Sequence, residues 1–149
     1  YISALSNGGT FYKPRIMRSV INALGETIKE SETVSLGGLD SDALRFLPFV
    51  QQGMRDAVKK PYGTSYLVND VPMPVAAKTG SSQILNRTKT NAFFVGYAPA
   101  QDYEENSPSA EPELAILILV EDAREGSVNT IPVARDVFMW YYENRMKMR

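Results

Sequence analysis

The sequence predicts an α/β chain of the α+β type, in which an antiparallel sheet is covered by helices. Three segments rich in apolar, β-branched and aromatic residues follow one another at residues 75–83, 90–98 and 114–120, and their clustering indicates one sheet. A helical pattern ends the chain and is expected to pack on that sheet. The 149 residues, 44% apolar and 22% charged, match the size and composition of one globular domain.

The first nine residues have the pattern of a helix end. Residues 1–5 resemble a last helical turn, and the Asn-Gly-Gly at residues 7–9 tolerates the left-handed conformation of a C-cap. We therefore expect this helix to begin upstream of the sequence. Residues 10–22 and 25–28 then predict two strand-like arms joined by a short turn.

The next segment predicts a helix. Residues 40–42 can cap a short helical turn, Pro48 suits the first position of a longer helix that runs to about Lys59, and Pro61 ends it. Three apolar residues recur at helical spacing and are expected to face the core: Val50, Met54 and Val58.

The segment 114–120 consists of seven consecutive apolar residues, which is typical of a strand covered on both faces. We expect it to lie centrally in the sheet. Residues 101–113 carry five acidic residues, two prolines and no basic residue, and this composition predicts a solvated loop.

The last helix is the clearest in the sequence. Asn129 or Thr130 can cap it, and Pro132 stands near its expected first position. The residues that follow a 3.6-residue period are expected to cover the sheet, and they are Val133, Val137, Trp140, Tyr141 and Asn144.

Composition excludes several classes of function. Sixteen basic and seventeen acidic residues give a net charge of −1 without a basic cluster, which argues against nucleic acid as a partner. Cysteine and histidine are absent, so disulfides, thiolate or imidazole catalysis and the usual transition-metal ligand sets are excluded. The longest apolar run has seven residues, whereas a membrane-spanning helix needs about 20.

One segment carries the elements of a catalytic site. Lys78-Thr79-Gly80 follows small and apolar residues in a predicted strand, and the Ser-Ser-Gln at residues 81–83 continues it. On an edge strand that faces a cleft, Lys78 would be a point charge for a substrate carboxylate. Thr79 and Ser81 alternate to one face, so both hydroxyls could bind that carboxylate, and Gly80 lets an acyl group approach the backbone. A surface lysine that protects a sheet edge is the alternative interpretation of Lys78.

The sequence resembles the class B penicillin-binding proteins, of the penicillin-binding protein 2 type. The motif K-T-G-[TS]-[AS]-[QE] matches at 78–83, and an aromatic strand that ends in G-[YF]-x-P matches at 91–99. Asn-Gly-Gly with a downstream proline, Gly53-Met54 with Val58, and the Ile-Pro-Val-Ala-Arg of residues 131–135 also match the family, in its order. The resemblance implies that residues 1–149 are the C-terminal part of one transpeptidase domain.

The family's other two motifs lie elsewhere. No serine in the chain stands three residues before a lysine, so the family's S-x-x-K nucleophile is missing. Ser127-Val128-Asn129 imitates the S-x-N motif but follows Lys-Thr-Gly instead of preceding it, and we interpret it as a coincidence. Both motifs are expected in an upstream half of the domain, so the isolated chain is expected to be inactive. In the family, the backbone N–H of the residue at Ser81 is an oxyanion-hole donor.

By resemblance, the intact protein is a serine-type peptidoglycan D,D-transpeptidase that cross-links stem peptides and is acylated by β-lactams. No metal or organic cofactor is implied. The resemblance also implies an upstream membrane anchor, a place on the extracytoplasmic (periplasmic) side, and possible contacts with other cell-wall synthesis proteins. Two alternatives remain: a serine β-lactamase or β-lactam sensor domain, and a non-catalytic binding module. The Gly-Thr-Ser at residues 63–65 is interpreted as a turn.

Overall fold

The computed structural model describes residues 1–84, 89–103, 111–123 and 126–148. Its centre is a three-stranded antiparallel sheet in the order β5-β6-β7. The strands are β5 (Ala76–Ile84), β6 (Lys89–Ala98) and β7 (Leu114–Val120), so the predicted antiparallel sheet is confirmed.

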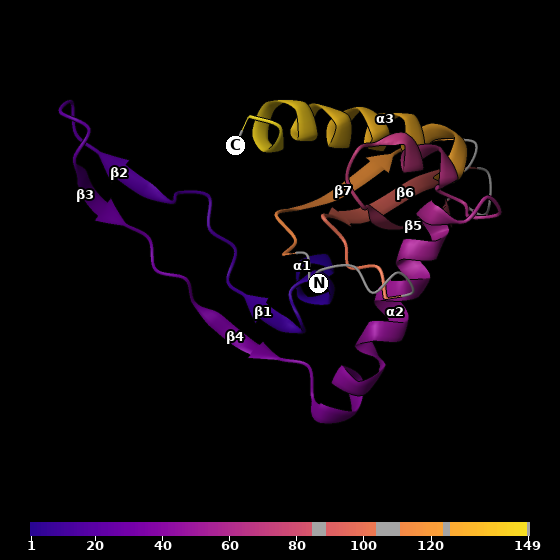
Figure 1. The fold of residues 1–149 in the computed structure, drawn as a ribbon, viewed down its shortest axis with the longest axis horizontal. Coiled ribbons are helices and arrows are strands. Elements are labelled where there is room, and N and C mark those ends of the chain that lie inside the picture. Colours follow the sequence, from indigo (N-terminus) through magenta and orange to yellow (C-terminus); the bar gives the residue numbers. More distant parts are fainter. Residues whose placement is uncertain (85–88, 104–110, 124–125, 149) are drawn as a thin grey trace.

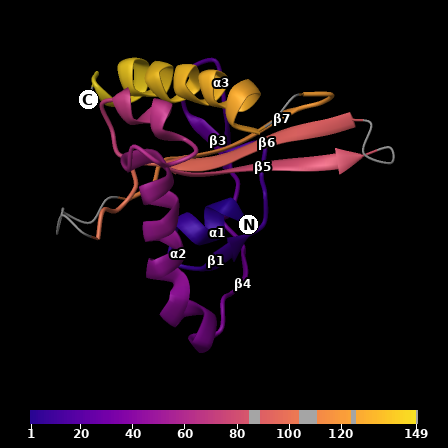
Figure 2. The same cartoon turned by 90° about the vertical axis from the view of Figure 1, so that its right-hand side faces the viewer.

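Helices lie on both faces of this sheet (Figures 1 and 2). The long helix α3 (Gly126–Tyr141) packs on one face and continues into the π-helical turn η2 (Tyr142–Met146). The short helix α1 (Ile2–Ser6) contacts β6 and β7 from the other face. Helix α2 (Ser41–Lys59) runs past the start of β5, and the 3₁₀ turn η1 (Tyr66–Asp70) connects the two.

Residues 10–38 form a long ribbon that extends away from this body (Figure 1). Strand β1 (Thr10–Tyr12) pairs with β4 (Ser35–Gly38), and β2 (Ser19–Ile21) pairs with β3 (Thr27–Glu30), both antiparallel. The first predicted arm, residues 10–22, is present as the two short strands β1 and β2, and the second, residues 25–28, corresponds to β3. Strand β4 was not predicted. Nearly all residues of these strands are exposed, so the ribbon contributes little to the core.

Two apolar clusters hold the layers together, one on each face of the sheet. The α3 side joins α3, η1 and the sheet through residues that include Val68, Ala77, Phe94, Ala134 and Phe138. The α1 side joins α1 and α2 to the sheet through Met54, Ala76, Tyr97 and Ala100, with Ile2 and Leu5 packed against them. Burying one of the large aliphatic or aromatic side chains of these clusters stabilises the folded state by about 1.5–3 kcal/mol.

The predicted C-cap of the first helix is confirmed. Gly8 and Gly9 have φ angles of 86° and 99°, in the left-handed region that glycine adopts without strain. The N–H of Gly9 donates to the carbonyl of Ala4 at 2.8 Å, which closes the helix end.

Helix α2 differs from its prediction. It is one helix from Ser41, capped by the Asp40 carboxylate, which accepts the N–H of Ala43 at 2.8 Å, and Pro48 lies inside it. The Asp40 cap starts the helix well before the proline. Packing of the buried face of α2 outweighs the backbone hydrogen bond that is lost at Pro48. Met54 and Val58 are buried as predicted, but Val50 is 45% exposed. The buried face consists of Leu47, Gln51, Met54, Arg55 and Val58.

The predicted face of the last helix was wrong except for Tyr141, which packs against the apolar cluster on the α3 side. Helix α3 begins at Gly126, six residues before Pro132, and its fully buried residues are Thr130, Ala134 and Phe138. Trp140 is 56% exposed. A helix with apolar residues on several sides has more than one plausible stripe, and contact with the sheet selected this one. The other predicted stripe residues, Val133 and Val137, are exposed.

The predicted position of residues 114–120 was also wrong. Strand β6 is central, and β7 pairs only with β6 among the described residues. Leu117 and Leu119 are 64% and 44% exposed. A continuous apolar run indicates that both faces of a strand can be buried. It does not indicate which strands lie beside it in the sheet.

The loop after β6 is anchored by a buried carboxylate, contrary to the prediction of a solvated loop for Asp102. Asp102 is 2% exposed and forms ion pairs with Lys59 at 2.9 Å and Arg55 at 3.4 Å. Arg55 also donates to the carbonyl of Val75 at 3.1 Å. The backbone N–H of Tyr103 donates to the Gln52 side chain at 3.0 Å. Residues 104–110 of the predicted loop lie outside the described residues.

No helix in the described part of the chain has both the length and the apolar character needed to cross a membrane.

Replacing the buried carboxylate should destabilise the fold strongly. Asp102→Asn leaves two cations near a buried site without a counter-ion, and the expected loss is about 3–5 kcal/mol in the free energy of unfolding. Urea denaturation checks this. Asp70→Asn is the matched control, because Asp70 also pairs with an arginine but its side chain is 51% exposed, so its loss should be much smaller. Equal losses for the two variants would contradict the buried-charge account.

The Asp70–Arg135 pair should give a pH dependence of its own. Arg135 Nε donates to Asp70 at 2.8 and 3.0 Å, and this hydrogen bond lowers the pKa of the Asp70 carboxyl. Because the folded-state pKa is lowered, the contribution of the pair is complete above the unfolded pKa of about 4 and is lost as pH falls through the folded value. Carboxyl ¹³C shifts should show the pKa of Asp70 rising in Arg135→Gln. An unchanged pKa in that variant would contradict this cause.

Candidate active site

Lys78, Thr79, Gly80 and Ser81 lie in the middle of β5. Their backbone register is set by β6, in which Val95, Phe94, Phe93 and Ala92 stand opposite them in that order. Strand β5 has no partner on its other side among the described residues, so its outer edge is free. The structure therefore agrees with the prediction of an edge strand for this segment.

Alternation along β5 separates Lys78 from its neighbours. Ala76 packs in the cluster on the α1 face and Ala77 in the cluster on the α3 face. By alternation, Lys78 and Gly80 lie on the α1 face with Ala76, and Thr79 lies on the α3 face with Ala77. Lys78 is exposed, and its ammonium donates to the carbonyl of Thr79 at 2.5 Å. The strand thus presents one accessible cation beside its free edge.

The two hydroxyls of the segment have different environments. Thr79 is 8% exposed, and its hydroxyl donates to the Thr64 hydroxyl at 3.0 Å. Ser81 is exposed. Ser81 and Thr79 share a face by alternation, and the prediction that both bind a carboxylate stays a prediction. The contact with Thr64 adds a third hydroxyl to the same stretch of the edge.

Sequence reasoning missed Thr64 as a neighbour of the site. The turn at residues 63–65 follows α2 closely, because Gly63 donates its N–H to Lys60 at 2.8 Å and Ser65 donates to Ala57 at 2.9 Å. A Cβ on Gly63 would stand 2.2 Å from the Ala57 carbonyl oxygen. The signal available in the sequence was the glycine directly before a hydroxyl residue, at the end of a helix that leads into the Lys-Thr-Gly strand.

Ser127-Val128-Asn129 lies within α3, which agrees with its interpretation as an unrelated imitation of S-x-N. In the described part of the chain, no group of three or more acidic, cysteine or histidine residues has the arrangement of a metal site. The chemistry available from Lys78, Thr79 and Ser81 is charge attraction, hydroxyl hydrogen bonding and backbone N–H donation at the edge of β5.

A family model described as the penicillin binding protein transpeptidase domain matches residues 1–138. The chain belongs to this family. The match includes α1, the ribbon, α2 and the whole sheet, so it is not confined to the Lys-Thr-Gly strand.

Curated relatives agree with this assignment. The chain is 27% identical to penicillin-binding protein 2A of Bacillus subtilis over 99% of its own length, and 23% identical to the peptidoglycan D,D-transpeptidase MrdA of Haemophilus influenzae over 95%. It spans 22% of the length of each of these relatives.

Solved structures share the fold. A D,D-transpeptidase domain of a peptidoglycan glycosyltransferase from Eggerthella lenta superposes with a TM-score of 0.72 at 24% identity, over 97% of this chain and 31% of that one. A penicillin-binding protein A of Mycobacterium tuberculosis, solved as a ceftriaxone acyl-enzyme complex, gives 0.69 at 21% identity, over 91% of this chain and 29% of that one. The mixed fold of sheet and helices in this chain is thus the fold of penicillin-binding transpeptidases.

Two glycine-to-alanine substitutions should change the free energy of unfolding in opposite directions, one through a steric clash with the backbone and the other through helix propensity. Gly63→Ala forces a methyl group onto the Ala57 carbonyl and should lower the free energy of unfolding by roughly 1–3 kcal/mol. Gly53→Ala, in the interior of α2 with nothing within 4 Å of its added Cβ, should raise it by about 0.5–1 kcal/mol. Urea denaturation of both variants checks this. A neutral Gly63→Ala would show that the turn moves freely away from α2.

Proposed function

We propose that this chain supplies one wall of the active site of a serine-type peptidoglycan D,D-transpeptidase. The observation that carries the proposal is the family match over residues 1–138 together with the position of Lys-Thr-Gly on the free edge of β5. An edge strand can bind a peptide by backbone pairing, which suits a substrate with a D-Ala-D-Ala end.

The reaction has two acyl transfers, and the nucleophilic serine comes from an upstream part of the domain. The serine oxygen attacks the carbonyl carbon of the D-Ala-D-Ala peptide bond and loses its proton to a base, an acyl ester forms, and D-alanine leaves with a proton on its amine. An amine of a second stem peptide then attacks the ester, and the serine is regenerated. A β-lactam follows the first step and stays on the serine as the acyl ester.

The residues of β5 have separate roles in this proposal. The Lys78 ammonium attracts the terminal carboxylate of the donor peptide, and the hydroxyls of Thr79 and Ser81 hydrogen-bond it. The backbone N–H of Ser81 stabilises the developing oxyanion together with a second donor from the upstream part. Gly80 keeps the strand surface flat, so the acyl chain can lie against the backbone.

Three features of the protein belong to the proposal as well. The intact protein acts on the extracytoplasmic side of the cytoplasmic membrane, held there by an upstream anchor, as its resemblance to the penicillin-binding proteins implies. Stem peptides, β-lactams, the upstream half of the domain and other cell-wall synthesis proteins are its partners. The long ribbon of residues 10–38 favours a transpeptidase over a β-lactamase or β-lactam sensor, because it is a large element that catalysis of hydrolysis alone does not require.

Penicillin labelling followed by intact-mass measurement tests the proposal. The chain and a longer product that includes the upstream half of the domain are incubated with penicillin in parallel. We expect a stable adduct on the longer product and none on the chain. An adduct on the chain would show that it contains its own nucleophile, and no adduct on either would favour a non-catalytic binding module.

Lys78 is tested in the longer product. Lys78→Met should slow acylation by penicillin about a hundredfold, the effect expected for one charged or oxyanion contact in the transition state. Lys89→Met is the matched control, because Lys89 lies on the neighbouring strand, is exposed and pairs with Asp122 at 2.8 Å. Similar acylation rates in the wild type and Lys78→Met would contradict the role of Lys78.

A further inference from the structure

Two exposed tyrosines stand on either side of Thr64, in the turn that leads from α2 to η1. Tyr62 is 82% exposed and Tyr66 is 42% exposed. Each is two residues from Thr64, so its Cα lies within about 7 Å of the Thr64 Cα. The Thr64 hydroxyl accepts a hydrogen bond from the Thr79 hydroxyl at 3.0 Å. Both tyrosines therefore lie in the surroundings of the Lys-Thr-Gly strand.

The core of the protein fixes the backbone of this turn. Ser65 is fully buried, and its N–H donates to the carbonyl of Ala57 at 2.9 Å. The N–H of Tyr66 donates to the carbonyl of Gly63 at 3.2 Å, and Val68 is buried in the cluster on the α3 side. An exposed aromatic surface on such a turn can bind a ligand at little cost in backbone order.

The leaving group of the proposed reaction lies beside this turn. In the proposed function, the hydroxyls of Thr79 and Ser81 bind the terminal carboxylate of the donor peptide, and this carboxylate belongs to the D-alanine that leaves. The amine nitrogen of D-alanine is two bonds from its carboxylate carbon, about 2.5 Å away. Attack by a second amine reverses this departure, so the incoming nitrogen takes the position that the D-alanine nitrogen left. Thr64 borders that position through its contact with Thr79.

We propose that Tyr62 and Tyr66 bind the acceptor stem peptide by packing on the aliphatic chain that carries its primary amine. The inference rests on the proposed function and adds an acceptor surface to it. A neutral ring suits this amine, because the amine must lose its proton before it attacks. A carboxylate in the same place would raise the pKa of the amine and hold it as an ammonium ion. The rings instead offer apolar area for the chain to cover.

The step at this surface is the second acyl transfer. The amine nitrogen attacks the carbonyl carbon of the acyl ester, a bond forms between these two atoms, and the bond from the carbon to the serine oxygen breaks. The amine loses a proton and the serine oxygen gains one, so the serine is regenerated. Tyr62 and Tyr66 take no part in the proton transfer. They raise the local concentration of the amine, which competes with water for the ester.

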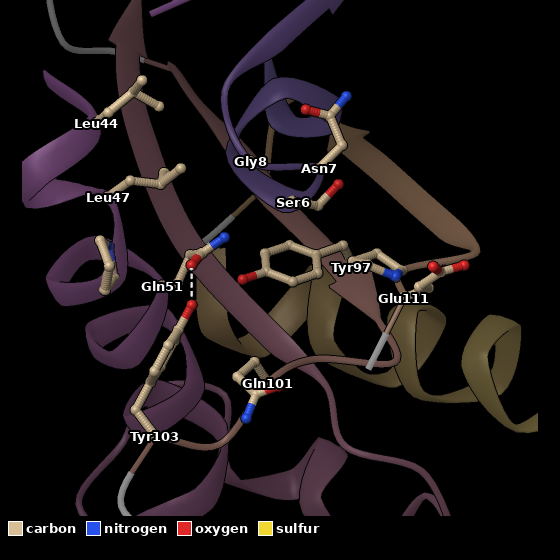
Figure 3. A pocket seen from close by; sticks show the side chains of 12 residues that line it. Ser6, Asn7, Gly8, Leu44, Leu47, Gln51, Tyr97, Gln101, Tyr103 and Glu111 are labelled. Atoms are coloured by element: carbon tan, nitrogen blue, oxygen red, sulfur yellow. Dashed lines mark hydrogen bonds between the residues drawn. The ribbon is translucent and has the colours of Figure 1, made fainter. Parts of the chain in front are cut away.

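The cavity around Tyr97 is a different place in the fold. Its volume is about 900 Å³, and it lies between α1, α2 and the segment that follows β6 (Figure 3). Neither residues 60–67 nor residues 78–81 line it. The surface proposed for the acceptor is therefore the exposed side of the turn and not this cavity.

Competition between an amine and water for one acyl ester tests the proposal, on the longer product that includes the upstream half of the domain. The donor is a thioester of N-acetyl-D-alanine. The acceptors are N-acetyl-lysine amide, whose amine ends a flexible chain, and hydroxylamine, which has no chain. Mass spectrometry gives the ratio of aminolysis to hydrolysis product. Because both products come from the same ester, this ratio does not depend on the rate of the first acyl transfer.

Tyr62→Ala and Tyr66→Ala should each lower this ratio about fivefold for N-acetyl-lysine amide, but less than about twofold for hydroxylamine. Tyr62→Phe and Tyr66→Phe keep the ring and should restore the ratio. Tyr12→Ala is the matched control, because Tyr12 is also an exposed tyrosine but lies in the ribbon. An unchanged ratio in the alanine variants, or an equal fall with both amines, would overturn the proposal.

Penicillin labelling of the same samples reports on the proposed function separately. A normal adduct together with an unchanged ratio would overturn only the acceptor role of the two tyrosines. The absence of an adduct on the wild-type longer product would overturn the proposed function, and this inference with it.

Discussion

The buried ion pairs of Asp102 are the interaction on which the rest of the structure depends. Lys59 and Arg55 come from α2, Asp102 comes from the loop after β6, and Arg55 also binds the carbonyl of Val75 directly before β5. One cluster thus joins the helix, the loop and the start of the strand that carries Lys-Thr-Gly. The net stability from such a buried pair is small, because desolvation opposes the attraction, but each partner strongly restricts where the others can lie.

Because the start of β5 is held in place, the side chains along its edge have defined positions. From Ala76 onward the pairing with β6 sets the register of each residue and the face to which its side chain points, so Lys78 lies on the α1 face and Thr79 on the α3 face. Helix α2, whose Arg55 binds the carbonyl of Val75, ends four residues before Gly63, and the close contact of Gly63 with Ala57 brings Thr64 to Thr79. Helix α2 therefore positions both the strand and its hydroxyl neighbour.

Helix α2 has a further role on its other side. Gln51 and Gln52 bind the end of α1 and the Tyr103 segment, and these bonds shape the cavity around Tyr97. The polar residues of this helix face restrict the arrangement of the fold more than its apolar residues do, since each polar residue has a partner in a different element. A helix whose buried face contains glutamine and arginine connects elements by directional bonds, whereas a purely apolar face would permit sliding.

The sequence by itself determined the antiparallel sheet, the C-cap at Gly8 and Gly9, and Lys78 on a strand, because these follow from local periodicity, from glycine's conformational freedom and from a motif with matching flanks. Only the tertiary structure decided that β7 lies beside β6 at an edge of the strands described, that α3 buries Phe138 and exposes Trp140, and that Asp102 is buried. Those outcomes depend on which surfaces meet, and a pattern along one segment contains no information about its neighbours.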